Sequence, residues 1–491
     1  MRCPTPVALA EVVARLQAHG LLVGAPAVEA SLSGAADDSR AVRRGDLFCA
    51  WAGTSADGHA YVPAAEAAGA AAALVERELG GVTIPQVLVT DGRRAAAVAA
   101  MAVYGDPAER LRLVGVTGTN GKSTTAWMLR HLLGARWVPA SVGTLGVRLR
   151  DGSMVPGTEN LTTPGPVELA RLLADLVAGG VEAVAMEVSS HALDQGRVAA
   201  LRFDAAVFTN LTRDHLDYHG TFEAYRAAKA SLVELLRPDG VAVVNADDPA
   251  WDGVAERAPR AVRFGRGAEL RAESVVLGAD GARFRLVAPA GAVDIHLPLL
   301  GDYNVENALA SAATGLALGL TLGEVADRLA SVPQVPGRLE RLAERPCLVL
   351  RDYAHTPDAL ERALGALRAL APARLLVVFG AGGDRDRGKR PLMGAAASRA
   401  ADVVIVTSDN PRTEDPDAII AEIEAGLDGR PHERLTDRRE AIARALELAR
   451  PGDIVLLAGK GHETYQVVGT EKRHFDEREI VAELLAAGAR A

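Results

Sequence analysis

The segment Leu113–Thr125 constrains the fold of this chain more than any other part of the sequence. Its first half is an apolar run, and its second half is a glycine-rich turn that ends in Gly-Lys-Ser. A helical pattern follows, with Ala126, Leu129 and Leu133 on one face and Gly134 at its end. A buried strand that enters a helix through such a turn is typical of α/β proteins with a parallel sheet.

The turn has the chemistry to bind a phosphate chain. Gly118 and Gly121 allow a tight backbone whose N–H groups point at phosphate oxygens, and the helix N-terminus adds partial positive charge. Lys122 can reach the β- and γ-phosphates, and the Ser123 hydroxyl can ligate Mg²⁺. Val116 stands where the standard pattern has its first glycine, so a purely structural turn is the alternative. We predict that the chain binds ATP and uses its γ-phosphate.

Length and charge narrow the class of protein. A chain of 491 residues with 49% hydrophobic residues can bury several cores, and we expect three domains, at residues 1–108, 109–336 and 337–491. The formal net charge of −9 argues against a broad surface for nucleic acid or for an anionic membrane. The order of strand-like and helical segments predicts an α/β fold. We expect a small N-terminal α/β domain, a central P-loop-like ATPase domain with a mainly parallel sheet, and a C-terminal Rossmann-like doubly wound domain.

We expect the chain to be cytoplasmic. The N-terminus lacks a basic segment followed by an apolar core, and the longest uncharged run, 307–323, is too short and polar for a membrane span. The three cysteines are far apart and fit no disulfide or metal framework. We expect reduced thiols and a monomer.

Local patterns predict several elements. We expect an alanine-rich helix at 63–74, strands at 73–75, 183–188, 205–209, 241–245, 348–351, 375–379, 403–407 and 454–458, and helices near 416–427 and 437–449. Thr356 is the expected N-cap of a helix that starts with Pro357. Residues 260–299 alternate like strands and indicate a local antiparallel piece. The segment Gly380–Arg385 lacks the third glycine of a dinucleotide fingerprint, so we do not expect NAD.

Polar side chains gather after two of the central strands. Glu187 ends one strand, and a carboxylate near a phosphate loop can hold Mg²⁺, although a helix cap is an equal alternative. The loop after Thr209 carries Asp214, His215, Asp217 and His219. His191 and His215 do not share metal-ligand spacing, so zinc is not indicated, and a structural role is the more frequent one for any single histidine.

Eight separated motifs resemble those of the Mur ligase family of ATP-dependent amide-forming enzymes. Five of them span the chain: Gly118–Thr124, Glu187–His191, Asn210–His215, Asn304–Ala308 and Asp352–Pro357. Three more narrow the resemblance to the members that add diaminopimelate in peptidoglycan synthesis: Gly383–Pro391, Ser408–Arg412 and Gly459–Glu463.

The resemblance implies that ATP activates a substrate carboxylate as an acyl phosphate, which an amine then attacks to give an amide, ADP and phosphate. It assigns Ser123 and Glu187 to one Mg²⁺ and His215 and a carbamylated Lys229 (N6-carboxylysine) to a second, with Lys122 on the outer phosphates. Lys229 is chosen by the resemblance alone, because a lone helix lysine is normally a solvated surface residue. The implied nucleotide-binding residues are Gly118, Thr119, Asn120, Gly121, Lys122, Ser123, Thr124, Asn307, Arg338, Asp352, Tyr353 and His355. Domain closure would exclude water from the acyl phosphate.

The implied partners are UDP-N-acetylmuramoyl-L-alanyl-D-glutamate and meso-diaminopimelate. The residues implied for the nucleotide sugar are Ser39, Thr54, Ser55, Ala56, Thr162, Thr163, Ser189, Gln195 and Arg197. Thr54-Ser55 and Leu161 depart from the His-Gln pair and the Asn found in some members. The residues implied for diaminopimelate are Arg385, Asp409, Asn410, Pro411, Arg412, Gly459 and Glu463. Arg412 can pair with the second carboxylate of diaminopimelate, which lysine lacks.

Three other functions are compatible with the sequence. A lysine-adding ligase would prefer lysine in an amino-acid panel, and a folylpolyglutamate synthetase-like ligase would accept a reduced folate and glutamate. A non-catalytic nucleotide-sugar-binding protein would have no use for Lys122, Glu187, His215 and Lys229.

Overall fold

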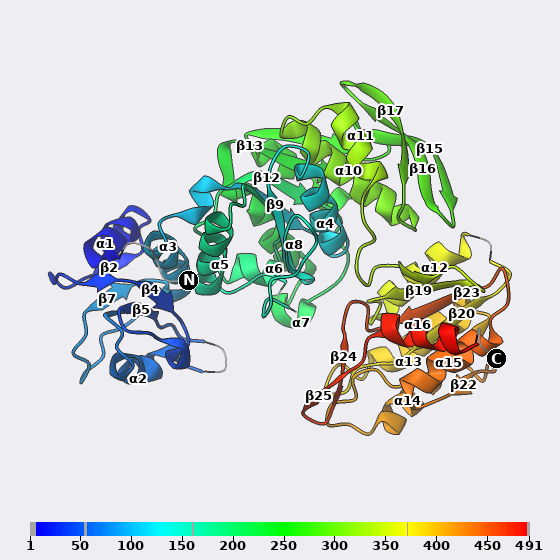
Figure 1. Cartoon of the computed structure of the whole chain (residues 1–491). Helices are drawn as coiled ribbons and strands as arrows, with labels where there is room; N and C mark the ends of the chain where they lie inside the picture. The colour runs from blue at the N-terminus through cyan, green and yellow to red at the C-terminus, as the bar shows by residue number, and fades with distance from the viewer. Residues whose placement is uncertain (1–5, 54–55, 160–161, 371, 489–491) are drawn as a thin grey trace. The chain divides into compact units, whose positions relative to one another are not determined.

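A computed structural model describes residues 6–53, 56–159, 162–370 and 372–488, and it contains three main β-sheets (Figure 1). The chain divides into two compact units. The first is formed mainly by the residues up to Ala272 together with Glu306–Arg328, and the second mainly by the residues from Leu329 onward. Within the described residues, no helix is long and apolar enough to cross a membrane.

The N-terminal part of the first unit is a five-stranded sheet. Its order is β2 (Leu22–Gly24), β7 (Gln86–Val89), β6 (Ala72–Val75), β5 (Asp46–Cys49) and β4 (Gly34–Ala36). All neighbours are parallel except β2 and β7. A short antiparallel pair, β1 (Val7–Ala8) and β3 (Ser31–Leu32), and three helices complete this part: α1 (Leu9–Ala18), α2 (Val62–Ala67) and α3 (Gly92–Val103). The helix expected at 63–74 therefore ends at Ala67, whereas the strand expected at 73–75 is present as β6.

The central sheet has seven strands and is parallel apart from its first pair. Its order is β10 (Gly146–Arg148), β9 (Pro139–Gly143), β11 (Ala183–Glu187), β8 (Arg112–Thr117), β12 (Phe203–Phe208), β13 (Leu236–Asn245) and β14 (Arg260–Phe264). The helices of this region are α4 (Lys122–Leu133), α5 (Pro166–Ala178), α6 (Ser190–Asp194), α7 (Leu216–His219), α8 (Phe222–Ala230), α9 (Val254–Arg257), α10 (Asp302–Ala317) and α11 (Leu322–Ala330).

The segment 260–299 is only partly the separate piece that its alternation indicates. Its first strand, β14, extends the central sheet in parallel to β13. Its remaining strands, β15 (Arg271–Gly278), β16 (Gly281–Ala288) and β17 (Gly291–Leu297), form a three-stranded sheet in that order.

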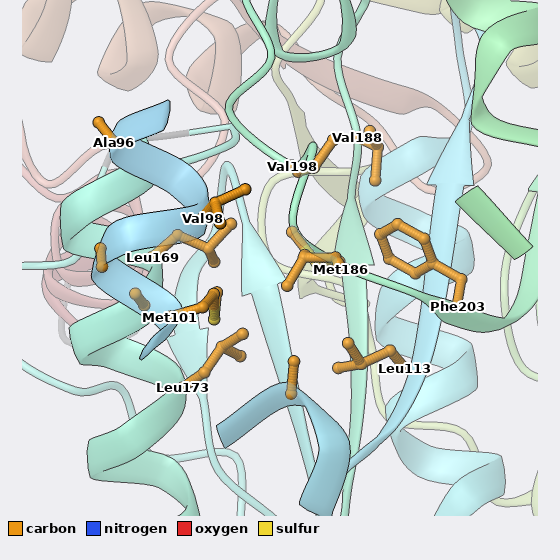
Figure 2. Close-up of a cluster of buried hydrophobic side chains, with 14 of the residues drawn as sticks. Ala96, Val98, Met101, Leu113, Leu169, Leu173, Met186, Val188, Val198 and Phe203 are labelled. Atoms are coloured by element: carbon orange, nitrogen blue, oxygen red, sulfur yellow. The ribbon is translucent and has the colours of Figure 1, made fainter. Parts of the chain in front are cut away.

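Helices α3 and α5 pack against each other and join the N-terminal and central sheets through one hydrophobic core. Figure 2 shows Met101 of α3 with Leu169 and Leu173 of α5, and Met186 of β11 in the same cluster. The buried residues of α5 recur three and four positions apart, which places them on one face of the helix.

Replacement of Leu173 by alanine should destabilise the first unit. The side chain is fully buried in this core, so its truncation leaves a cavity and should lower the free energy of unfolding by about 2–5 kcal/mol. Leu392→Ala is the matched control, because Leu392 is 59% exposed and should lose less than about 0.5 kcal/mol. Urea denaturation checks both. Equal losses would contradict the packing role of Leu173.

The C-terminal sheet has six strands with helices on both faces. Its order is β18 (Glu340–Ala343), β19 (Leu348–Asp352), β23 (Ile454–Ala458), β20 (Leu375–Phe379), β21 (Val403–Val406) and β22 (Glu433–Arg434), all parallel except β18 and β19. Its helices are α12 (Pro357–Arg368), α13 (Lys389–Ala400), α14 (Pro416–Glu424), α15 (Arg438–Leu448) and α16 (Glu477–Gly488).

Alternation along β20 shows how this sheet is covered. Val377 and Phe379 pack with α12, α13 and α14, whereas Leu376 and Val378 pack with α15 and α16. The predicted doubly wound architecture is therefore confirmed. The antiparallel hairpin β24 (Tyr465–Val468) and β25 (Glu471–His474) follows β23.

Candidate active site

The expected strand, turn and helix are present around Gly118. Strand β8 ends at Thr117 and α4 begins at Lys122. Gly118 and Gly121 both have positive φ, at 144° and 85°. A Cβ on Gly118 would overlap the Thr209 hydroxyl, and one on Gly121 would overlap the Asn307 amide. Both positions therefore require glycine for backbone and for space.

Two lysine side chains converge on one carbonyl of this turn. Lys122 Nζ donates to the carbonyl oxygens of Gly118, at 2.9 Å, and Thr119, at 2.8 Å. Lys229 Nζ donates to the same Gly118 oxygen at 2.7 Å. Lys229 is 1% exposed, and burial, reinforced by the charge of Lys122, places its pKa well below the usual value. The expectation of a solvated surface lysine on α8 is wrong, and the lowered pKa favours the neutral form of this amine.

The loop after β12 and the helices α8 and α10 hold the turn in place. The Thr119 N–H donates to the Asn210 carbonyl at 2.7 Å, and the Asn120 N–H donates to the Asn210 amide oxygen at 3.0 Å. The Thr119 and Tyr225 hydroxyls are 3.0 Å apart. Thr125 donates to Asn307 at 3.2 Å. The loop that carries the histidines and the helix that carries Lys229 thus meet the phosphate turn.

His215 lies at the start of α7 in a cluster of rings. Its φ is 51°, a left-handed value that is uncommon outside glycine. The ring centroid is 4.8 Å from that of His191 and 6.2 Å from that of Tyr225, and the Tyr225 ring is 4.9 Å from Lys229 Nζ. The His215 side chain is 47% exposed, so the imidazole is accessible to a ligand.

Glu187 is the last residue of β11 and pairs with Val116 of β8, next to the phosphate turn. It is 2% exposed. Its carboxylate accepts the Thr144 N–H at 2.8 Å and the Thr144 hydroxyl at 3.3 Å. Ser189 caps α6 two residues later, so the helix N-cap with a nearby acid, which the sequence offered as the alternative, is also present.

Five of the residues expected to bind the nucleotide sugar form a network beside Glu187. The Thr163 hydroxyl donates to the Glu187 carbonyl at 2.9 Å and accepts the Ser189 N–H at 3.1 Å. Arg197 donates to the Thr163 carbonyl at 2.9 Å and to the Gln195 amide oxygen at 2.8 Å. Thr162 joins through the Thr144 hydroxyl at 3.1 Å.

The other expected sugar-binding residues lie on the N-terminal sheet. Ser39 begins a short 3₁₀ helix after β4, and Asp38 caps it. Ala56 accepts the Gly53 N–H at 2.9 Å in a separate turn. Thr54 and Ser55 lie outside the described residues, as does Leu161.

The side chains present fit magnesium bound together with phosphate. Among the described residues, no three His, Cys, Asp or Glu side chains form a group that could hold a metal ion. Ser123, Glu187 and His215 offer single donors, and a carboxylated Lys229 would add another. Mg²⁺ takes one or two protein oxygens and completes its shell with phosphates and water. A buried amine of lowered pKa also suits carbamylation, which needs the neutral form.

The nucleotide residues expected in the second unit cluster at the end of β19. The Asp352 carboxylate accepts the N–H groups of Leu339, at 2.7 Å, and Ala354, at 2.9 Å. The Arg338 guanidinium lies 4.9 Å from the centre of the Tyr353 ring, and the His355 ring meets the Tyr353 ring edge to face with centroids 4.6 Å apart. Burial raises the pKa of Tyr353 to about 12 and lowers that of His355. The cluster offers an aromatic face and a cation, a combination suited to a nucleotide.

The residues expected to bind diaminopimelate meet at the ends of β20, β21 and β23. The Gly383 N–H donates to the Asn410 carbonyl at 2.9 Å, and Arg412 Nη1 donates to the Gly383 carbonyl at 2.6 Å. A Cβ on Gly382 would lie 3.0 Å from Arg412 Nη1 and 3.8 Å from Arg385 Cγ. Two arginines therefore border one glycine turn.

Acidic side chains from the β21 and β23 loops face each other beside Arg412. Asn410 donates to Glu463 Oε2 at 2.9 Å, and Gly459 lies against Asp409. Burial and the neighbouring Asp409 raise the pKa of Glu463. Burial opposes ionisation of Asp409 too, but the charges of Lys460, Arg438 and His355 together outweigh it and lower the pKa of Asp409. Lys460 was not chosen from the sequence, although it stands within the Gly459–Glu463 motif. Lys389 was missed as well; it donates to the His355 carbonyl at 2.9 Å.

Comparison with known proteins gives matches along most of the chain. Residues 34–111 match the Mur ligase family, catalytic domain; residues 116–315 match the Mur ligase middle domain; residues 337–461 match the Mur ligase, glutamate ligase domain. A UDP-N-acetylmuramoyl-L-alanyl-D-glutamate--2,6-diaminopimelate ligase from Geobacter metallireducens is 46% identical over 480 residues, covering 91% of this chain and 92% of the relative. The enzyme of the same name from Geobacillus kaustophilus is 47% identical over 456 residues, covering 90% and 92%.

A solved structure of a UDP-N-acetylmuramoyl-L-alanyl-D-glutamate--2,6-diaminopimelate ligase is also similar. It is 36% identical, covers 94% of this chain and 96% of its own, and has a TM-score of 0.69. The expected three-domain α/β fold is confirmed by these matches. The chain belongs to the Mur ligase family.

Proposed function

We propose that this chain joins meso-diaminopimelate to UDP-N-acetylmuramoyl-L-alanyl-D-glutamate with ATP, in peptidoglycan synthesis. The observation that carries the proposal is the turn in which Arg412 lies beside Gly382 and Gly383, with Glu463 close by. A guanidinium and a carboxylate together match the carboxylate and ammonium at the distal end of diaminopimelate. The relatives at 46% and 47% identity carry the name of this activity.

The phosphate turn and its lysine would activate the acid. A carboxylate is a poor electrophile, and transfer of the γ-phosphoryl group gives it a leaving group. Backbone N–H groups of the turn and Lys122 would bind the triphosphate and stabilise the negative charge that develops during transfer. The amine of diaminopimelate then attacks the acyl carbon, and phosphate departs as the amide forms.

The network around Glu187 would hold the nucleotide sugar near the phosphates. Thr163, Ser189 and Arg197 are fixed to one another and to the end of β11, so their free donor positions are preorganised. Two Mg²⁺ ions, one held by Ser123 and Glu187 and the other by His215 and a carbamate on Lys229, would neutralise charge between the two anionic reactants.

The arginine in the β21 loop should decide which amino acid is used. Arg412→Lys keeps the charge but loses the bidentate pairing with a carboxylate, so we expect the KM for diaminopimelate to rise about tenfold or more. The KM for ATP should change less than about twofold, since Arg412 makes no part of the phosphate turn. Initial rates with each substrate varied in turn measure both values.

Arg439→Lys is the matched control for this experiment. Arg439 is an exposed residue of α15 that pairs with Glu483, and the same substitution there should leave both KM values unchanged. Equal increases for diaminopimelate and ATP in Arg412→Lys would contradict the selectivity role. A wild-type preference for lysine in an amino-acid panel would overturn the proposed substrate.

A further inference from the structure

A buried lysine lies among the residues proposed to bind diaminopimelate and has no part in the proposed reaction. Lys460 is 0% exposed. Its Nζ donates to the Asn410 amide oxygen at 3.0 Å and to the Tyr465 carbonyl at 2.8 Å. It also lies 3.4 Å from Asp409 Oδ1 and 3.8 Å from Glu463 Oε2. One ammonium therefore contacts the β21 loop, the β23 loop and the start of the hairpin.

These contacts fix the orientation of the Asn410 amide. Its oxygen accepts from Lys460 and from the Val467 N–H, at 2.9 Å, while its nitrogen donates to Glu463 Oε2, at 2.9 Å. A flipped amide would point its NH₂ group at an ammonium and an N–H group, which are both donors. Lys460 thus determines that Asn410 donates to Glu463 and holds that carboxylate in one place.

The hairpin continues this contact to Arg412. Val467 lies opposite Lys472 in the β24–β25 pair, and its backbone groups point to the β21 loop. The Arg412 N–H donates to the Val467 carbonyl at 3.1 Å, and the Gly469 N–H donates to the Arg412 carbonyl at 2.7 Å. Gln466 donates to the Asp409 carbonyl at 2.7 Å.

Arg412 needs this support because its φ is 51°, in the left-handed region that a side chain with a Cβ disfavours. Such a conformation persists where surrounding contacts determine it, and it is found at ligand-binding positions. The backbone bonds from Val467 and Gly469 hold both polar groups of this residue.

We propose that Lys460 is a positioning residue that fastens the hairpin 465–474 to the turn 409–412, and so aims Arg412 and Glu463 at the distal end of the incoming amino acid. The inference rests on the proposed function and deepens it. Lys460 does not contact the reacting atoms; it acts through Asn410 and the hairpin.

The charge of Lys460 matters as well as its hydrogen bonds. It stands between the buried Asp409 and the half-buried Glu463, and the charge of Asp409 raises the pKa of Glu463. Without the ammonium, the pKa of Glu463 would rise further, and a protonated Glu463 would be a weaker partner for the distal ammonium. A variant that keeps the hydrogen bonds but loses the charge therefore separates the two effects.

The test measures selectivity, using full-length enzyme and the ratio of kcat/KM for diaminopimelate to that for lysine. Lysine lacks the distal carboxylate, so the ratio measures how well Arg412 is oriented to bind that carboxylate. Lys460→Met should lower this ratio about tenfold or more, with the KM for ATP within about twofold of wild type. Lys472→Met, on the exposed strand of the same hairpin, should leave the ratio unchanged.

Two more variants keep the test decisive. Lys460→Gln can still donate to Asn410 and Tyr465, and it should recover part of the ratio lost in Lys460→Met. Gln466→Ala removes one half-buried contact between hairpin and turn and should lower the ratio about threefold, even where Lys460→Met fails to fold.

The outcomes distinguish a failure of the positioning role from a failure of the proposed function. The positioning role alone is overturned if the wild-type enzyme uses diaminopimelate and the ratio is unchanged in Lys460→Met. Where Lys460→Met does not fold, an unchanged ratio in Gln466→Ala has the same meaning. Parallel losses for diaminopimelate and lysine also overturn it, because they indicate a general structural effect. Wild-type enzyme that adds no diaminopimelate overturns the proposed function and this inference with it.

Discussion

Lys122→Ala should lower ATP-dependent ligation by at least about a thousandfold while the protein stays folded. In the structure this ammonium lies over the turn and donates to the Gly118 and Thr119 carbonyls of its own loop. Phosphate oxygens are stronger acceptors for a cation than carbonyls, so a bound triphosphate would take the ammonium over. Its charge would then stabilise the transferring phosphoryl group.

The expected loss is in the chemistry more than in the fold. Lys122 is half-buried at the first position of α4, and alanine is the best helix former. Product mass and phosphate release give the rate, and circular dichroism checks the fold. Lys472→Ala, an exposed lysine on β25, is the control and should ligate like wild type. Near wild-type ligation by Lys122→Ala would show that this turn does not bind the reacting phosphates.

The sequence predicts those parts of the fold that local patterns determine. The strand, turn and helix around Gly118 follow from an apolar run, two glycines and a helical face, and all three are present. Thr356 caps α12 as expected, since its hydroxyl accepts the Ala359 N–H. The β20 strand is apolar at every position, which is typical of a parallel strand covered on both faces.

Features that depend on tertiary contacts were not predictable in this way. The strand expected at 73–75 is present, but the helix expected at 63–74 ends at Ala67, because the alanines from Ala72 onward pair with β5 and β7 as part of β6. Lys229 looks like a surface residue until the Gly118 carbonyl is placed over α8. The role of Lys460 could not be predicted for the same reason. One of its partners, Asn410, is 50 residues away, and no local pattern predicts how the hairpin packs against the turn.

Lys229→Ala should lower ligation by about a thousandfold, and short carboxylic acids should partly restore it. The amine is buried and shares its acceptor with Lys122, so its charged form is strongly disfavoured. A neutral amine can react with CO₂ to give a carbamate, whose oxygens are suitable ligands for Mg²⁺. The cavity left by alanine would admit a small carboxylate that supplies such oxygens.

The lowered pKa also gives the sign of a stability effect. With the native pKa of Lys229 below the unfolded value of 10.5, the unfolded chain binds more protons between the two values. Stability in CO₂-free buffer should therefore rise with pH through this window, and this contribution should be absent from Lys229→Ala. Lys472→Ala should keep the pH dependence of wild type.

Bicarbonate separates a carbamate from a structural role for the amine. Wild-type activity should fall in CO₂-depleted buffer and return when bicarbonate is added, whereas Lys229→Ala should respond to acetate and not to bicarbonate. A carbamate signal in ¹³C NMR with labelled bicarbonate should be present in wild type and absent from the variant. Activity that is indifferent to CO₂, with no such signal, would mean that Lys229 acts as an amine; its hydrogen bond to Gly118 would then serve only to hold the phosphate turn.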